Sequence, residues 1–364
     1  MKLLYIVPNV NHEGGVARVL SIKANFFLEK LGFEVHILIQ NNGNSPLFYY
    51  FNEKIVFHDM ILNGSGLQFI NSYRKALNNK IKAISPDIIL VCDNGLKAYT
   101  IPFILKTKIP IVFECHGSIF IEEKKNNKFQ FLNQLNLLFK DYSVNKFAKF
   151  VALSDESLKE WNVENGLVIP NPLWLQTEVS AVLQSKKVIA VARHSYEKGL
   201  DRLLLIWVKV VEKYPDWRLE IYGKYSADLN LEQLAQSLNI NDNVSFYEPV
   251  KDINYKYLNA SFYVMTSHYE GFPMVLLEAM ASGLPCIAYD CPCGPRAIIQ
   301  NNENGFLVEN GNLDVFVQKL ELLIEDENLR LQMGKNAQES VKIYNLDSIM
   351  QKWKSLFEDL VKNN

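Results

Sequence analysis

The chain has 364 residues, of which 48% are hydrophobic, and its formal charge is −2 at pH 7. This length suits two domains with sizeable cores, and the near balance of charge argues against a general nucleic-acid-binding protein. The sequence has no run of about eighteen apolar residues that would predict a membrane-spanning helix, and the apolar run at residues 3–7 is too short for a secretory signal. Five scattered cysteines predict no disulfide framework, so we expect a cytoplasmic protein.

The first half of the chain alternates between apolar runs and helical stretches, the pattern of an α/β domain with a parallel sheet. We expect strands at residues 3–7, 35–39, 88–92, 111–114 and 151–154, and a helix from residue 16 to residue 31. Gly14 and Gly15 precede that helix, and His116 follows the strand at 111–114. Open parallel sheets bind ligands at the carboxyl ends of their strands, so these three residues are candidates for a binding site. The alternative is that the glycines only allow a turn and that the histidine is structural.

Residues 120–150 mix basic and aromatic side chains. The lysines are Lys124, Lys125, Lys128, Lys140, Lys146 and Lys149, and the aromatic residues are Phe120, Phe129, Phe131, Phe139, Tyr142, Phe147 and Phe150. This mixture at helical spacing is typical of a helix that lies on an anionic bilayer. It is equally typical of an amphipathic helix whose aromatic side chains face a core. The sequence leaves both interpretations open, and acidic residues in the same stretch predict that any membrane-surface contact is weak.

Pro170 and Pro172 predict a stiff, extended linker, which we place at residues 171–186. The alternation of strands and helices then starts again. We expect strands at residues 188–192, 217–222, 244–247, 261–265, 286–289 and 304–308, and helices at 313–323, 325–341 and 346–362. The sequence therefore predicts an N-terminal domain at residues 1–170, a C-terminal domain at 187–345 and a final helix at 346–364.

Two cations follow the first strand of the second domain. Arg193 and Lys198 leave the same strand end, so their side chains can converge on one point. Arginine offers phosphate a fork of donors, and lysine offers a compact charge. The alternative is that both are surface charges.

The stretch Met265–Tyr289, MTSHYEGFPMVLLEAMASGLPCIAY, reads as loop, helix, turn and strand. Pro273 suits the start of a helix, and the residues that follow it are strong helix formers. The free N–H groups and the dipole at that helix end form an anion site, with Glu270 before it and Glu278 within the helix. A diphosphate could bind there, between carboxylates that accept hydrogen bonds from sugar hydroxyls. The alternative is that Glu270 only complements the dipole and that Glu278 is a solvated helix residue.

The pattern SxxEGFPxxLLEAMAxGxPxIA resembles the donor-site signature of retaining glycosyltransferases of family GT4, which have the GT-B fold. The resemblance implies two Rossmann-like domains with parallel sheets that face each other across a cleft, and a last helix that crosses back to the first domain. It implies transfer of a hexosyl or N-acetylhexosaminyl group, with retention, from a nucleoside diphosphate sugar to a hydroxyl of a saccharide or lipid-linked saccharide. We expect no metal and no further cofactor, because no carboxylate cluster such as a DxD is visible.

The resemblance also assigns roles to residues. It places Gly14 and Gly15 beside the donor phosphates, His116 and Glu270 at the sugar, Arg193 and Lys198 on the diphosphate, the turn with Val250 at the base, and Glu278 at the ribose. The loop and first helical turn that bind the donor comprise Glu270, Gly271, Phe272, Pro273 and Met274. One departure is Ala297, where the family usually has a glutamate before Ile-Ile. Cys291 and Cys293 have no second pair that would make a zinc site, so we interpret them as a loop near the phosphates.

Two other functions share these features. A sugar-nucleotide epimerase on the same fold would need no acceptor, and a non-catalytic protein would bind the sugar nucleotide without turnover. We favour the transferase, with uridine over guanosine in its donor, acting in bacterial surface polysaccharide synthesis at the inner face of the cell membrane. The motifs do not identify the donor sugar or the acceptor, since one or two hydroxyl contacts decide such selectivity.

Overall fold

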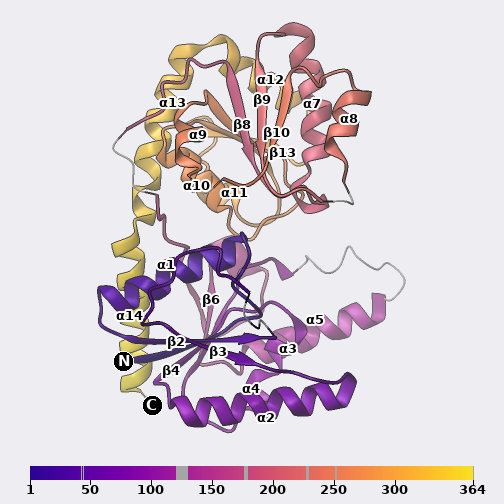
Figure 1. Cartoon of the computed structure of the whole chain (residues 1–364). Helices are drawn as coiled ribbons and strands as arrows, with labels where there is room; N and C mark the ends of the chain where they lie inside the picture. The colour runs from indigo at the N-terminus through magenta and orange to yellow at the C-terminus, as the bar shows by residue number, and fades with distance from the viewer. Residues whose placement is uncertain are drawn as a thin grey trace. The chain divides into compact units, whose positions relative to one another are not determined.

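The computed structural model describes residues 1–41, 43, 45–119, 130–175, 179–226, 229–250 and 252–363. It divides into two compact units (Figure 1). Unit 1 consists of Met1–Pro172 and Asp347–Asn364, and unit 2 consists of Leu173–Leu346. Each unit holds one sheet in which all paired strands are parallel. The fold class is therefore α/β with two Rossmann-like units, as the sequence predicts.

The sheet of unit 1 has the strand order β3-β2-β1-β4-β5-β6-β7. Its strands are β1 (Lys2–Ile6), β2 (Glu34–Gln40), β3 (Val56–Met60), β4 (Ile88–Val91), β5 (Ile111–Glu114), β6 (Lys149–Ala152) and β7 (Gly166–Val168). Its helices are α1 (Gly15–Glu29), α2 (Gly66–Ile84), α3 (Leu96–Tyr99), α4 (Ile101–Ile104), α5 (Gln130–Val144), α6 (Asp155–Lys159) and nearly all of α14 (Leu346–Lys362).

The sheet of unit 2 has the strand order β10-β9-β8-β11-β12-β13. Its strands are β8 (Lys187–Val191), β9 (Arg218–Tyr222), β10 (Val244–Tyr247), β11 (Phe262–Met265), β12 (Cys286–Asp290) and β13 (Gly305–Glu309). Its helices are η4 (Tyr196–Lys198), α7 (Leu200–Lys213), α8 (Leu231–Ser237), α9 (Asn254–Leu258), α10 (Met274–Ala281), α11 (Pro295–Ile298), α12 (Leu313–Glu325), α13 (Glu327–Ser340) and η5 (Val341–Tyr344).

The predicted strands are present, and most of them have apolar runs that are buried on both faces. In the central strand β4, for example, all four residues are fully buried. The elements that were not predicted include β3, α2 and β7 and several short helices, among them α3, α4 and α6. Strand β3 reads VFHDM at the edge of its sheet, and β7 has only three residues, so neither shows a clear apolar run. Within the described ranges, no helix is long and apolar enough to cross a membrane.

The basic and aromatic stretch at 120–150 is of mixed character. Residues 120–129, with three of its lysines, lie outside the described residues. Phe147 and Phe150 are buried, as the core-facing interpretation predicts, and Lys140 is buried as well. Leu138 and Tyr142 of α5, in contrast, are 66% and 57% exposed. The described part therefore supplies both core side chains and an exposed apolar surface.

Candidate functional site

The loop between β11 and α10 carries the motif that the sequence analysis singles out. Strand β11 ends at Met265, and α10 begins at Met274 directly after Pro273. Within the described residues, no side chain caps this end of α10. The Leu276 N–H donates to the Pro273 carbonyl oxygen at 3.0 Å. The helix dipole favours an anion at the other N–H groups of the first turn, those of Met274 and Val275.

Glu270 of this loop forms an ion pair with Lys198, the last residue of η4. The Lys198 Nζ lies 2.8 Å from both Glu270 Oε1 and Oε2, and the Ser267 hydroxyl donates to Oε1 at 2.6 Å. The Lys198 side chain is 21% exposed and that of Glu270 is 9% exposed. An ammonium has three N–H donors, so Lys198 retains one for a further acceptor. The sequence analysis names both residues as site candidates. It does not predict that they contact each other or that Ser267 donates a hydrogen bond to Glu270.

Hydrogen bonds to main-chain carbonyl oxygens fix η4 and Gly199 against the loop between β11 and α10. The His268 N–H donates to the Glu197 carbonyl oxygen at 2.8 Å, and the Thr266 hydroxyl donates to the Gly199 carbonyl oxygen at 2.8 Å. Gly199 has a φ of +57°, and a Cβ there would lie 2.2 Å from the Thr266 carbonyl oxygen. Only glycine fits this position, so the glycine that follows Lys198 has a steric reason.

Arg202 of α7 is a residue that the sequence analysis missed. Its guanidinium donates to the carbonyl oxygens of Thr266 and Ser267, and it lies 4.5 Å from the centroid of the Tyr289 ring. Burial lowers the pKa of Arg202 from its ordinary value, an effect that Tyr289 opposes. In sequence, Arg202 resembles any polar residue of an amphipathic helix. Its place one turn after Gly199 is the only signal that could have found it.

Arg193 and Lys198 have separate carboxylate partners. The Arg193 Nη2 lies 3.0 Å from Glu197 Oε1, and the Arg193 side chain is more than half exposed. Arg193 is thus free to reorient toward a ligand, whereas Lys198 is held at the loop.

Glu278 is almost completely buried, with 1% of its surface exposed. Its Oε1 accepts a hydrogen bond from Trp174 Nε1 at 2.7 Å, and its Oε2 accepts one from the Tyr257 hydroxyl at 3.3 Å. The alternative that Glu278 is a solvated helix residue is therefore wrong. These bonds fix the position of the carboxylate in the core of unit 2.

The loop with the two cysteines packs against the start of α10. The Glu270 N–H donates to the Pro292 carbonyl oxygen at 3.2 Å. Gly294 has a φ of +116°, and a Cβ there would lie 2.5 Å from Pro273 Cδ. Cys291 and Cys293 are buried cysteines, and burial raises the pKa of Cys291 to about 12. The loop thus supports the anion site sterically, and the Cys291 thiol is protonated at neutral pH.

The other predicted positions lie at the ends of strands or helices. Gly14 precedes α1, with its N–H donated to His12 Nδ1 at 2.9 Å, and Gly15 is the first residue of α1. Val250 is partly buried in the turn after β10. The main chain at Ala297 accepts a hydrogen bond from the Tyr344 hydroxyl at 2.9 Å, in the short helix α11.

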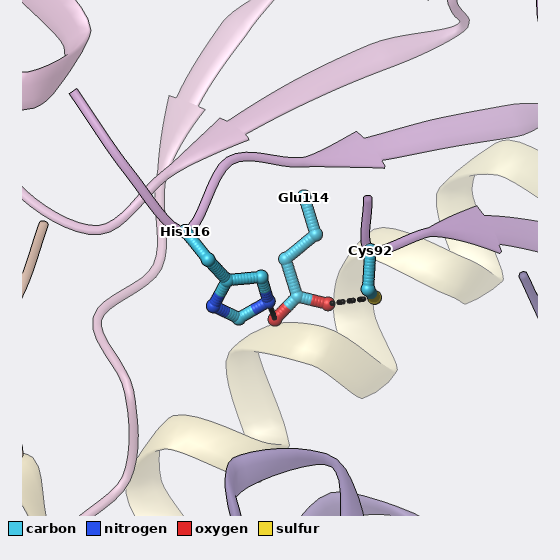
Figure 2. Close-up of side chains that lie close together, drawn as sticks. All are labelled: Cys92, Glu114 and His116. Carbon is cyan, nitrogen blue, oxygen red and sulfur yellow. Dashed lines mark hydrogen bonds and ion pairs between the residues drawn. The ribbon is translucent and has the colours of Figure 1, made fainter. Parts of the chain in front are cut away.

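His116, in unit 1, lies two residues beyond the end of β5 and is part of a buried cluster (Figure 2). Its Nε2 is 3.3 Å from Glu114 Oε1, and the Cys92 thiol donates to Glu114 Oε2 at 3.2 Å. The three side chains offer metal-ligand atoms within 4.8 Å of one another. However, the Lys23 Nζ lies 2.5 Å from Glu114 Oε1. The ammonium of Lys23 therefore already neutralises the Glu114 carboxylate. A metal ion at the same oxygen would be repelled by that ammonium, so the three side chains do not fit a metal site.

Comparison with known proteins shows which family the chain belongs to. The family model of glycosyl transferases group 1 matches residues 176–340, and that of glycosyltransferase family 4 matches residues 14–175. An uncharacterized glycosyltransferase of Haemophilus influenzae is 31% identical over 361 residues, which cover 98% of this chain and 99% of the relative. The chain belongs to the family 4 glycosyltransferases.

This glycosyltransferase is also similar to the lipopolysaccharide 1,6-galactosyltransferase of Salmonella typhimurium, with 26% identity over 90% of each chain. The crystal structure of HepE from Anabaena in complex with UDP-glucose matches it with a TM-score of 0.77 and 19% identity, over 99% of this chain and 100% of HepE. The solved structures show that the fold is GT-B. The resemblance inferred from the donor-loop motif is thus confirmed.

Proposed function

We propose that this glycosyltransferase transfers a hexosyl or N-acetylhexosaminyl group, with retention of anomeric configuration, from a uridine diphosphate sugar to a saccharide hydroxyl. The observation that carries the proposal is the Lys198–Glu270 pair beside the uncapped start of α10. It combines positive charge for a diphosphate with a carboxylate for sugar hydroxyls. The UDP-glucose bound by HepE supports the choice of donor, and the activity of the Salmonella relative supports a lipopolysaccharide-type acceptor.

The leaving diphosphate gains negative charge as the glycosidic bond breaks. Lys198 has a third N–H for a phosphate oxygen, α10 offers its first-turn N–H groups, and Arg193 can add a forked contact. Donors that are fixed before the reaction stabilise such charge at little cost of reorganisation. We therefore propose that protein residues supply this stabilisation and that turnover is independent of added metal.

The remaining residues orient the donor. Glu270 accepts hydrogen bonds from the sugar, Glu278 accepts them from the ribose, and His116 contacts the sugar. The acceptor hydroxyl attacks the anomeric carbon on the face from which the diphosphate leaves, and a phosphate oxygen takes its proton. This sequence of bond changes retains the anomeric configuration and requires no enzyme nucleophile.

A weak membrane-surface contact is part of the proposal, and exposed apolar side chains on α4 and α5 support it. The exposed apolar side chains at α4 and α5 are Phe103, Leu135, Leu138 and Tyr142. The rings of Phe103 and Tyr142 are stacked with centroids 5.8 Å apart, and Lys146 Nζ lies 4.8 Å from the Tyr142 centroid. An apolar patch with a lysine at its edge suits an anionic leaflet, where each lysine contributes about 1 kcal/mol.

Sedimentation with anionic vesicles should decrease when Leu138 and Tyr142 are changed to serine, and it should decrease with salt. Equal sedimentation of both proteins with anionic and neutral vesicles would remove this surface from the proposal.

The function is tested in two steps. A thermal-shift screen of uridine- and guanosine-linked sugars first identifies the donor. Release of UDP is then measured with and without saccharide acceptors. Release that requires an acceptor supports the transferase, whereas loss of the donor without an acceptor, with conversion to an isomeric sugar nucleotide, would identify an epimerase. Donor binding without turnover under any condition would identify a non-catalytic binding protein.

A further inference from the structure

Unit 1 contains a lysine whose charge is enclosed by protein. Lys23, in the middle of α1, and Glu114, the last residue of β5, each have 1% of the side chain exposed. Their Nζ and Oε1 atoms lie 2.5 Å apart. The ring of Trp353 from α14 covers the ammonium, with its centroid 3.7 Å from Nζ. An ammonium over an indole face gains a cation–π attraction in addition to the ion pair.

Glu114 also contacts the ring of His116. Its Oε1 faces His116 Nε2 at 3.3 Å, and Figure 2 shows the other ring nitrogen directed away from the carboxylate. Burial acts to raise the pKa of Glu114, but the charge of Lys23 and the hydrogen bonds from His116 and Lys23 outweigh it, so that the pKa lies well below its ordinary value. Burial and the neighbouring Glu114 raise the pKa of Cys92, which is therefore a neutral thiol donor. Glu114 is thus an ionised acceptor, and the atom facing it on His116 is an N–H.

We propose that Lys23 and Glu114 are positioning residues that hold the His116 ring as its Nε2–H tautomer. In this tautomer Nδ1 carries no proton and accepts a hydrogen bond, so it suits a hydroxyl of the transferred sugar. The proposal rests on the proposed contact between His116 and the sugar. It extends the site to α14, since Trp353 covers the lysine that holds Glu114.

The ion pair has a clearer role at His116 than in stability. Replacing a buried ion pair by apolar residues of similar volume is often neutral or stabilising, because the charges lose their hydration. A fixed carboxylate beside a histidine, in contrast, decides which ring nitrogen carries the proton. The contact with His116, and its effect on which ring nitrogen carries the proton, therefore give the ion pair its clearest role.

The test compares three variants with the wild-type protein. Lys23→Met/Glu114→Leu removes both charges together, so that neither is left buried without its partner. Glu114→Asp keeps the negative charge but shortens the side chain by one methylene, which withdraws the carboxylate from the ring, and it serves if the double variant unfolds below the assay temperature. Cys92→Ala is the matched control, because it removes the other neighbour of Glu114 and leaves Lys23 and His116 in place.

Two readouts separate positioning from a structural role. The first is the ¹⁵N spectrum of the histidine rings at a pH where they are neutral, with His116 assigned by its loss in His116→Gln. We expect one Nε2–H tautomer in the wild type and in Cys92→Ala, and a mixture of tautomers in the double variant and in Glu114→Asp. The second is turnover, which should fall by about 10²-fold in the folded double variant.

Each failure has a different signature. An unchanged His116 spectrum in both the double variant and Glu114→Asp would overturn the positioning role. Stoichiometric zinc in the purified protein that is lost in Cys92→Ala would overturn it as well, in favour of a metal site. A third outcome would combine wild-type turnover in His116→Gln with mixed His116 tautomers in the double variant. It would refute the proposed sugar contact of His116 and leave the positioning role intact.

Discussion

The two units each contain a lysine–glutamate ion pair, and the two pairs differ in burial. In unit 1, Lys23 and Glu114 have 1% of each side chain exposed, and an indole ring covers the lysine. In unit 2, Lys198 is 21% exposed and Glu270 is 9% exposed, next to a helix end whose N–H groups are available. One pair is closed to solvent and the other is open on one side.

This difference indicates different functions for the same chemistry. A ligand cannot reach the closed pair without unpacking the core, so that pair can act only on its protein neighbours, among them His116. The open pair can share its charges, because Lys198 has a donor to spare and the carboxylate oxygens of Glu270 can accept further hydrogen bonds. The closed pair is therefore suited to positioning and the open pair to binding.

The largest effect should follow from Lys198→Ala. Loss of a fixed donor to the leaving diphosphate should lower kcat by about 10²–10³-fold. Arg193→Ala should also lower kcat, and by less, because Arg193 is exposed and its ion pair with Glu197 does not fix it at the loop. The measurement is initial-rate UDP release with saturating donor and acceptor.

The matched control is Lys209→Ala, since Lys209 also forms an ion pair in unit 2, with Asp314 at 2.7 Å on the exposed surface. Exposed pairs contribute about 0–1 kcal/mol, so this variant should retain wild-type kcat. If Lys198→Ala behaves like Lys209→Ala, the open pair has no role in turnover.

Glu278→Ala should weaken donor binding by a smaller factor. Hydrogen bonds to a charged group contribute about 1.5–3 kcal/mol, which corresponds to about 10–100-fold in the Kd of UDP. Calorimetric titration with UDP measures this change. The control is Trp174→Phe, which removes one protein partner of Glu278 but keeps the carboxylate. A Kd in Glu278→Ala equal to that of the wild type would exclude Glu278 from the ribose site.

Acid should destabilise the wild type more steeply than Lys23→Met/Glu114→Leu. The pKa of Glu114 in the folded protein lies below its ordinary value of 4.5. Between these two pKa values the unfolded chain binds a proton at Glu114 that the folded chain does not. The contribution of Glu114 to the free energy of unfolding is therefore complete above pH 4.5 and is lost as pH falls, by at most about 1.4 kcal/mol per pH unit. Urea unfolding at pH 7 and pH 3.5 measures the slope, and parallel decreases in both proteins would contradict the assignment.

The smallest effect is expected from chelation. Because Lys198, Arg193 and the start of α10 supply the positive charge, excess EDTA should leave kcat within about twofold of its value without chelator. Activity that EDTA abolishes and that magnesium or manganese restores would show that the protein donors are insufficient.

The open site could be predicted from the sequence because it is encoded locally. Glu270, Pro273 and Glu278 fall within nine residues, and helix-start chemistry in that segment predicts an anion site. Lys198 belongs to a second short motif, whose glycine has a steric requirement that the structure explains. The contact between the two motifs could not be predicted, because it depends on the parallel arrangement of β8 and β11.

The closed site could be predicted only in part. His116 was found from its place after a strand, but Lys23 lies 91 residues from Glu114 in sequence and looks like a solvent-facing helix residue. Nothing local reveals that its side chain turns into the core beneath Trp353. Glu278 is a similar case, since its partners Trp174 and Tyr257 come from segments that are remote in sequence.

The anomeric configuration of the product tests the central claim most directly. The purified protein is incubated with the UDP sugar found in the donor screen and with the acceptor that triggers UDP release, and the new linkage is examined by ¹H NMR. With an α-linked donor, we predict an α-glycosidic product from the wild type and the same product, formed about 10²–10³-fold more slowly, from Lys198→Ala. A β-linked product would contradict retention and the front-face mechanism, and it would require a base positioned opposite the diphosphate.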